Sequence, residues 1–162
     1  MNFLEQLVAE WYAYRGFFVR TNIKFGKRPG GGYEGEIDVA AFEPRTKRLV
    51  HIETSSDADS WAERKRRFVK KFGDAKQHYE EIFDFEFESL ECQAIVGYAQ
   101  KTLSQVDFGD DIHLVLIPEF IQGVTREVSR RHPMQAAIPE GYPLLRAIQF
   151  AVAYGEVADD DA

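Results

Sequence analysis

Two carboxylates, Asp38 and Glu53, are the residues of this chain best placed to do chemistry. Each lies in a short run of alternating apolar residues, which is typical of a half-buried strand, and a turn at residues 44–47 separates the two runs. Pairing the runs symmetrically about the turn puts the two acids opposite each other, roughly 5 Å apart at Cβ. Like charges this close repel, so a fold that keeps them needs a cation or a shared proton between them. A slip of one residue would instead place them on opposite faces.

The hairpin face that carries Asp38 and Glu53 would suit a Mg²⁺ or Mn²⁺ ion. The two carboxylates, the backbone carbonyl of Thr54 and water are hard oxygen ligands, and they leave coordination positions for a substrate phosphate. Such an ion can activate water and neutralise charge that develops on a phosphoryl oxygen. The alternative is a solvated polar face on which Glu53 pairs with Arg48 or Lys47, and spacing alone favours neither.

The elements that must position these acids follow from the hydrophobic periodicity. It predicts helices at residues 2–15, from 57 or 60 to about 83, from 118 onward and at 143–154, and strands at 17–25, 35–43, 49–55, 93–99 and 112–117. This order predicts an α/β fold with a mixed five-stranded sheet. The helices could lie on both faces of the sheet, or the outer two could pack on one side. Residues 1–155 are expected to form a single domain, and residues 156–162 a disordered acidic tail.

Composition narrows the class of protein. The 162 residues are 44% hydrophobic and 14% aromatic, which indicates one globular core and excludes a disordered chain. The absence of a long apolar run and of a signal peptide predicts a cytoplasmic protein with no membrane segment. The single cysteine, Cys92, excludes an internal disulfide and is expected to be a small buried hydrophobe. The net charge of −7 argues against a protein that coats nucleic acid, but it suits an enzyme that touches DNA at one site.

The chain carries the motif GEID at residues 35–38 and, one hairpin later, an apolar strand that ends near Glu53. This arrangement resembles the PD-(D/E)xK nuclease superfamily, whose fold is the restriction-endonuclease-like fold. The resemblance covers about residues 2–117, the αβββαβ core, with extra C-terminal helices beyond it. It implies a Mg²⁺-dependent DNA nuclease in which Asp38 and Glu53 hold the metal. It also makes Glu5 a candidate extra acid, although a first-turn glutamate that favours the helix dipole is the alternative.

The chain departs from that family at the position of its lysine, two residues after the glutamate, where Ser55 stands. A serine supplies no cation to position the attacking water, so either the site is inactive or another cation has taken over. Lys65 is the predicted substitute, because helical periodicity places it inside the apolar stripe of the long helix. A buried lysine needs partners, which Asp38 and Glu53 would provide. The alternatives are a lysine that snorkels at the rim of the stripe and, as a second candidate cation, Lys24.

Further side chains are predicted to assist the carboxylates. Glu36, His51 and Ser55 share their strand face and are auxiliary candidates, although a packed or surface histidine is the alternative for His51. A basic run at residues 64–71 could contact DNA phosphates or form a solvated helix face. The candidate contacts in that run are Arg64, Arg67 and Lys71. Three more arginines are interpreted as a solvated helix end: Arg126, Arg130 and Arg131.

The leading hypothesis is a metal-dependent DNA nuclease with Asp38, Glu53 and Lys65 as catalytic residues and Thr54 as a third metal ligand. The alternative is a catalytically inactive protein of the same fold that binds nucleic acid or protein, which Ser55 and the acidic net charge favour. A third hypothesis is an α/β interaction protein without a metal site. For the nuclease, the expected partner is DNA, a homodimer would supply two sites for two strands, and a protein partner could supply specificity.

Overall fold

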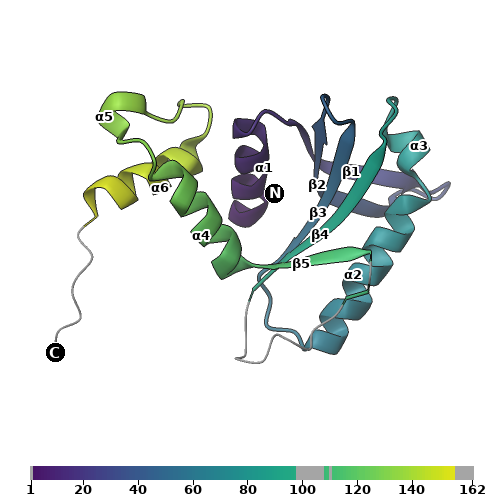
Figure 1. Cartoon of the computed structure of the whole chain (residues 1–162). Coiled ribbons are helices and arrows are strands. Elements are labelled where there is room, and N and C mark those ends of the chain that lie inside the picture. Colours follow the sequence, from purple (N-terminus) through teal and green to yellow (C-terminus); the bar gives the residue numbers. More distant parts are fainter. Residues whose placement is uncertain (1, 98–107, 110, 156–162) are drawn as a thin grey trace.

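The computed structural model describes residues 2–97, 108–109 and 111–155 and places helices on both faces of a five-stranded sheet (Figure 1). The elements are α1 (Phe3–Tyr14), β1 (Phe18–Lys27), β2 (Tyr33–Glu43), β3 (Arg48–Ser55), α2 (Trp61–Lys76), α3 (Tyr79–Ile82), β4 (Ser89–Val96), β5 (Ile112–Leu116), α4 (Ile117–Val128), α5 (Pro133–Ala136) and α6 (Pro143–Tyr154). The predicted α/β class and the order of the main elements are confirmed. The predicted acidic tail at residues 156–162 lies outside the described residues.

The strands follow the order β1-β2-β3-β4-β5. The first three are antiparallel. Strand β4 runs parallel to β3 because α2 carries the chain back along the sheet before β4 begins, and β5 pairs parallel to β4. The register of β2 and β3 is the one that symmetry about the turn predicts, with the pairs Val39–Ile52, Ala41–Val50 and Glu43–Arg48. Because a strand has a period of two, this register puts Asp38 and Glu53 on the same face.

Two helical layers enclose the sheet. On one face α1, α4 and α6 pack over a core that includes Val39, Ala41, Val50 and Ile52. On the other face α2 and α3 pack over Ala40, Leu49, Cys92 and Ala94. Helices therefore lie on both faces, and the two long C-terminal helices share the face that α1 covers. Cys92 is buried, as expected.

The long helix predicted from residue 57 or 60 to about 83 is two helices, and that prediction is wrong in part. Ser60 caps α2, its side chain accepting the N–H of Glu63 at 3.3 Å. Helix α2 ends at Lys76, and the chain turns at His78, whose ring bonds to Glu34 of β2 at 3.0 Å. The short helix α3 follows, and its Tyr79 packs in the core against the sheet.

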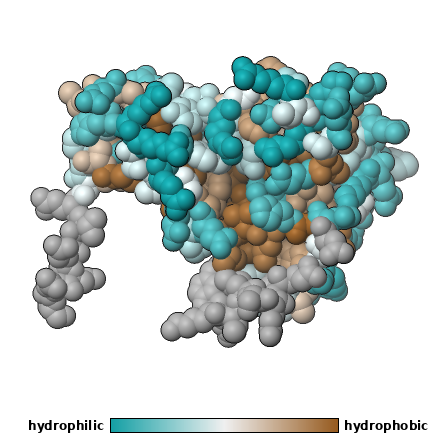
Figure 2. Space-filling view, in the orientation of Figure 1, coloured by the Kyte–Doolittle hydropathy of each residue, from teal (hydrophilic) through white to brown (hydrophobic). Residues whose placement is uncertain are grey.

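The edge strand β5 contributes apolar side chains to the surface of the protein. Figure 2 shows hydrophobic residues gathered between α4 and α2, where β5 lies in Figure 1. The half-buried apolar residues of this strand are Ile112, Leu114, Val115 and Leu116. None of the helices in the described part of the chain is both long and apolar enough to cross a membrane.

Helices α1 and α6 are joined by a buried carboxylate, Glu10. Its Oε2 accepts the N–H groups of Leu144 and Leu145 at 2.9 and 3.1 Å, and its Oε1 accepts the side-chain amide of Gln6 at 3.0 Å. The first N–H groups of a helix have no partner within it, so Glu10 caps α6 from a distant part of the sequence.

Replacing Glu10 with alanine is expected to lower the free energy of unfolding by about 2 kcal/mol, because it leaves the buried N–H of Leu145 and the partly buried N–H of Leu144 without an acceptor. Chemical denaturation at neutral pH would measure the loss. Glu119→Ala is the matched control, since Glu119 bonds to its own helix start at an exposed position and should cost less. Equal losses of unfolding free energy in Glu10→Ala and Glu119→Ala would show that burial does not strengthen the cap that Glu10 forms on α6.

Candidate active site

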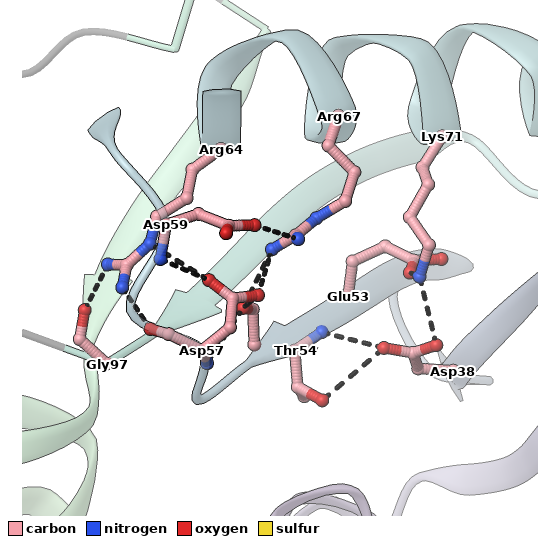
Figure 3. Close-up of polar contacts among 10 residues, drawn as sticks. Asp38, Glu53, Thr54, Asp57, Asp59, Arg64, Arg67, Lys71 and Gly97 are labelled. Carbon is pink, nitrogen blue, oxygen red and sulfur yellow. Dashed lines mark hydrogen bonds and ion pairs between the residues drawn. The ribbon is translucent and has the colours of Figure 1, made fainter. Parts of the chain in front are cut away.

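Asp38 and Glu53 lie where β2 and β3 separate (Figure 3). Both are buried, with 8% and 0% of their surface exposed. The backbone ladder ends at Val39–Ile52, and beyond it the N–H of Thr54 donates to Asp38 Oδ2 at 2.8 Å. The Thr54 hydroxyl approaches the same oxygen at 3.4 Å. The Asp38 carboxylate thus accepts the N–H of Thr54, which would bond to the backbone of β2 if the β2–β3 ladder continued.

Lys71 of α2 lies between the two acids. Its Nζ is 3.2 Å from Asp38 Oδ1 and also binds Glu53 Oε2. The side chain is 36% exposed, so it reaches the buried carboxylates from the rim of the helix. The pair of acids therefore has the cation that their mutual repulsion demands.

The prediction that Lys65 lies inside the buried stripe of α2 is wrong, because Lys65 is exposed. The buried positions of the helix are Arg64, Phe68, Phe72 and Ala75. The prediction took Trp61 as the centre of the apolar stripe, and this choice placed Lys65 inside the stripe. In the structure the buried face of α2 is centred nearer Phe68. Lys71 consequently flanks the stripe on the side of β2 and β3.

The opposite side of Glu53 is held by a buried chain of hydrogen bonds. His51 Nε2 is 2.8 Å from Glu53 Oε1, and His51 Nδ1 is 2.6 Å from the Tyr79 hydroxyl, which also contacts the Cys92 thiol. Because a carboxylate only accepts, His51 Nε2 donates to Glu53. Burial raises the pKa of Tyr79, so the phenol keeps its proton. The auxiliary candidate His51 therefore contacts Glu53 from within the core.

The charges of the cluster influence each other. Burial, followed by the nearby charge of Glu53, raises the pKa of Asp38, while Lys71 and Thr54 oppose that rise. Burial favours the neutral amine of Lys71, but the charges of Glu53 and Asp38 outweigh it and raise its pKa. Lys71 is therefore charged at neutral pH. Lys71 is thus the lysine that contacts both carboxylates of this buried cluster.

Ser55, at the end of β3, belongs to a second polar cluster. Asp57, Asp59, Arg64 and Arg67 of this cluster are labelled in Figure 3. The Ser55 hydroxyl accepts from Arg67 at 2.8 Å and donates to Asp57. Arg67 also bonds to Asp59 at 2.8 Å and to Asp57. Arg64 reaches Asp57 Oδ1 at 3.3 Å and the carbonyl of Gly97 at 2.5 Å. These contacts fix the start of α2 against the ends of β3 and β4.

The predicted DNA contacts of the basic run need correction. Arg64 is 1% exposed, so its guanidinium cannot meet a phosphate, and that prediction is wrong. Arg67 is 35% exposed but is held by two aspartates. Lys71 lies in the carboxylate cluster instead of on a solvated helix face.

Asp57→Asn is expected to cost about 1 kcal/mol of stability at pH 7. Burial disfavours the charged form, but hydrogen bonds from Ser55 and Arg67 outweigh it and lower the pKa from 3.8 to about 2. That fall corresponds to roughly 2.5 kcal/mol, which solvent screening at a side chain 35% exposed reduces. The unfolded state binds the proton first, so this stabilisation is present above pH 4 and lost as the pH falls toward 2. Unfolding curves of both proteins should therefore converge at low pH, and a constant difference would contradict the assignment.

The remaining predicted residues lie elsewhere. Glu5 accepts the backbone N–H of Asn2 at 2.9 Å and so completes the capping box of α1, which covers the other face of the sheet. Glu36 is half-buried on β2, two residues before Asp38, and pairs in register with Lys24 of β1. Lys24 is exposed, with its ammonium 5.6 Å from the centre of the Tyr33 ring.

The donor set at the cluster fits a divalent cation of the magnesium type. In a strand the N–H and C=O of one residue point to the same edge, so the carbonyl of Thr54 faces β2 together with the N–H that binds Asp38. Asp38, Glu53 and this carbonyl would offer three oxygen ligands, and water and substrate would complete the shell. Within the described residues no three His, Cys, Asp or Glu side chains gather as a metal site. An ion here would thus depend on the carbonyl of Thr54 as its third ligand from the protein.

No family model matches the chain, and neither a curated protein nor a solved structure is significantly similar to it. The geometry of the site therefore has to carry the functional argument.

Proposed function

We propose that the protein is a Mg²⁺- or Mn²⁺-dependent DNA nuclease of the PD-(D/E)xK superfamily, with the restriction-endonuclease-like fold. The observation that carries the proposal is the contact of Lys71 with both Asp38 and Glu53 at the point where β2 and β3 part. The order of helices and strands agrees with the core of that family. Ser55 counts less against activity than the sequence suggests, because a lysine from α2 reaches the acids by another route.

In this proposal each residue of the cluster has one task. Asp38, Glu53 and the Thr54 carbonyl hold the metal, which when bound activates water and offsets charge on the phosphoryl oxygens. Lys71 would orient the attacking water and stabilise the charge that develops in the transition state. His51 keeps Glu53 in place through its bond to Oε1.

A second candidate function is a catalytically inactive protein of the same fold that binds nucleic acid or protein. One observation favours this candidate: all four carboxylate oxygens of Asp38 and Glu53 already have hydrogen-bond or ion-pair partners within the chain. A metal would have to displace Lys71 from at least one of them. The two candidates therefore differ first in metal binding and then in cleavage.

The test is cleavage of single-stranded, duplex and branched DNA with Mg²⁺, Mn²⁺ or EDTA. The nuclease requires metal-dependent cleavage that falls to the level in EDTA in both Asp38→Asn and Glu53→Gln. Lys65→Met is the matched control and should cleave like the wild type, because Lys65 is exposed. Calorimetric titration with Mn²⁺ separates the alternatives: binding without cleavage supports the inactive protein, and neither binding nor cleavage rejects the metal site.

A further inference from the structure

A pocket of about 670 Å³ lies between α1, α4 and α6, on the face of the sheet opposite α2. Its size is in the range of pockets that enclose small organic ligands. Trp11 and Tyr14 of α1 line it, together with three arginines, Arg15, Arg130 and Arg131. The interpretation of Arg130 and Arg131 as part of a solvated helix end missed this, because only the fold brings them next to Arg15.

The pocket is positively charged in an acidic protein. Three arginines face one carboxylate, Glu127, which gives the lining a net charge of +2 against −7 for the whole chain. Arg130 pairs with Glu127 at 2.8 Å. Arg15 and Arg131 have no carboxylate partner among the residues that the structure describes. A concave site of this sign would concentrate anions.

The walls of the pocket are fixed before any ligand binds. Gln149 of α6 is 2% exposed and donates to the carbonyls of Arg131 and Ala136 at 2.9 and 3.0 Å. It thereby holds the segment that carries Arg131. The bonds from Glu10 to the start of α6 fix α1 against the same helix.

Gly123 in the middle of α4 also lines the pocket. A glycine inside a helix costs about 1 kcal/mol relative to alanine. A Cβ at this position would meet nothing within 4 Å, so helix packing does not require the glycine. Its effect is to leave this wall of the pocket open.

We propose that this pocket binds a nucleoside phosphate, either free or as the end of a nucleic acid strand. A phosphate monoester carries a charge of nearly −2 at neutral pH, which balances the +2 of the lining. Arginine forks bind phosphate oxygens in pairs. The Arg15 guanidinium lies 5.4 Å from the centre of the Trp11 ring, and a flat arginine and aromatic surface of this kind is one on which a base stacks. The inference does not depend on the proposed nuclease, because the two sites lie on opposite faces of the sheet.

The test is calorimetric titration with AMP, adenosine, inorganic phosphate, and 5′-phosphorylated and 5′-hydroxyl oligonucleotides. It is done with Asp38→Asn in EDTA, so that nuclease activity cannot consume the ligand. AMP is expected to bind at least about ten times more tightly than phosphate or adenosine, since each lacks half of the contacts. Binding of AMP alone identifies a free nucleotide, and binding of the phosphorylated strand but not the hydroxyl strand identifies a strand end. Binding of neither, or of phosphate as tightly as AMP, overturns the proposal.

Two variants locate the binding. Gly123→Leu should abolish AMP binding while unfolding at the same or a higher temperature, because it fills the pocket and improves the helix. Arg131→Ala should weaken binding by about tenfold or more. Arg126→Ala, a change at an exposed arginine of α4, is the control and should bind like the parent protein. If folded Gly123→Leu binds AMP normally, the ligand lies elsewhere and the inference is wrong.

Discussion

Lys71→Met is expected to lower the free energy of unfolding by about 3 kcal/mol and to reduce metal-dependent DNA cleavage by about 100- to 1,000-fold. The substitution keeps the length of the side chain and removes its charge. It leaves Asp38 and Glu53 facing each other in the core with no cation between them. The stability loss is placed at the lower end for a broken buried ion pair because Lys71 is 36% exposed. Urea unfolding in EDTA and cleavage assays with Mg²⁺ measure the two effects.

A divalent cation should take over the compensating role of Lys71 in this variant. Mg²⁺ or Mn²⁺ is expected to raise the unfolding temperature of Lys71→Met more than that of the wild type, since the metal no longer competes with the ammonium. Lys65→Met is the control and should change stability by less than about 0.5 kcal/mol. If neither metal stabilises Lys71→Met, the carboxylates do not hold a metal and the proposed nuclease fails.

The positions of the two carboxylates could be predicted because short-range rules determine them. Alternation with a period of two and a tight turn leave one register that buries the apolar face, and this register pairs Val39 with Ile52. Asp38 and Glu53 then share a face without reference to the rest of the chain. The same rules predict the order of strands and helices around them.

The cation could not be predicted in the same way. Periodicity gives the buried face of a helix only to within about one residue, and the sheet decides its final rotation. A lysine reaches several ångströms from its backbone, so Lys71 serves the site from the flank of the stripe. For Arg64 the error is the opposite one. It lies in a basic run and was predicted to be accessible to DNA, yet it is buried and bonds to Asp57 and to the Gly97 carbonyl. Both partners depend on tertiary structure, because Asp57 lies in the loop after β3 and Gly97 follows β4.

The hydrogen-bond chain below Glu53 also depends on tertiary structure. His51 and Tyr79 are 28 residues apart, and the break between α2 and α3 is what brings the phenol to the imidazole. The result is a glutamate held by His51 on one oxygen and by Lys71 on the other. Such an arrangement fixes the side chain, and it makes Lys71 the lysine that contacts the Glu53 carboxylate.

Adding Glu53→Gln to Lys71→Met is therefore expected to restore about 2 kcal/mol of the stability that Lys71→Met loses. Glutamine has nearly the shape of glutamate, and its amide oxygen still accepts the proton of His51 Nε2. The double variant no longer buries an uncompensated pair of charges, and removing both partners of a buried ion pair is tolerated better than removing one. Unfolding of the two single variants and the double variant measures this coupling.

Cleavage should not recover in the double variant, because it lacks both a metal ligand and the lysine. The control cycle is Lys70→Met with Asp74→Asn, an exposed pair on the same helix, whose coupling should stay below about 0.5 kcal/mol. If the Glu53 and Lys71 losses simply add, then the ammonium of Lys71 does not stabilise the charge of Glu53. The cluster would in that case lack the charge coupling on which a metal site of this kind depends.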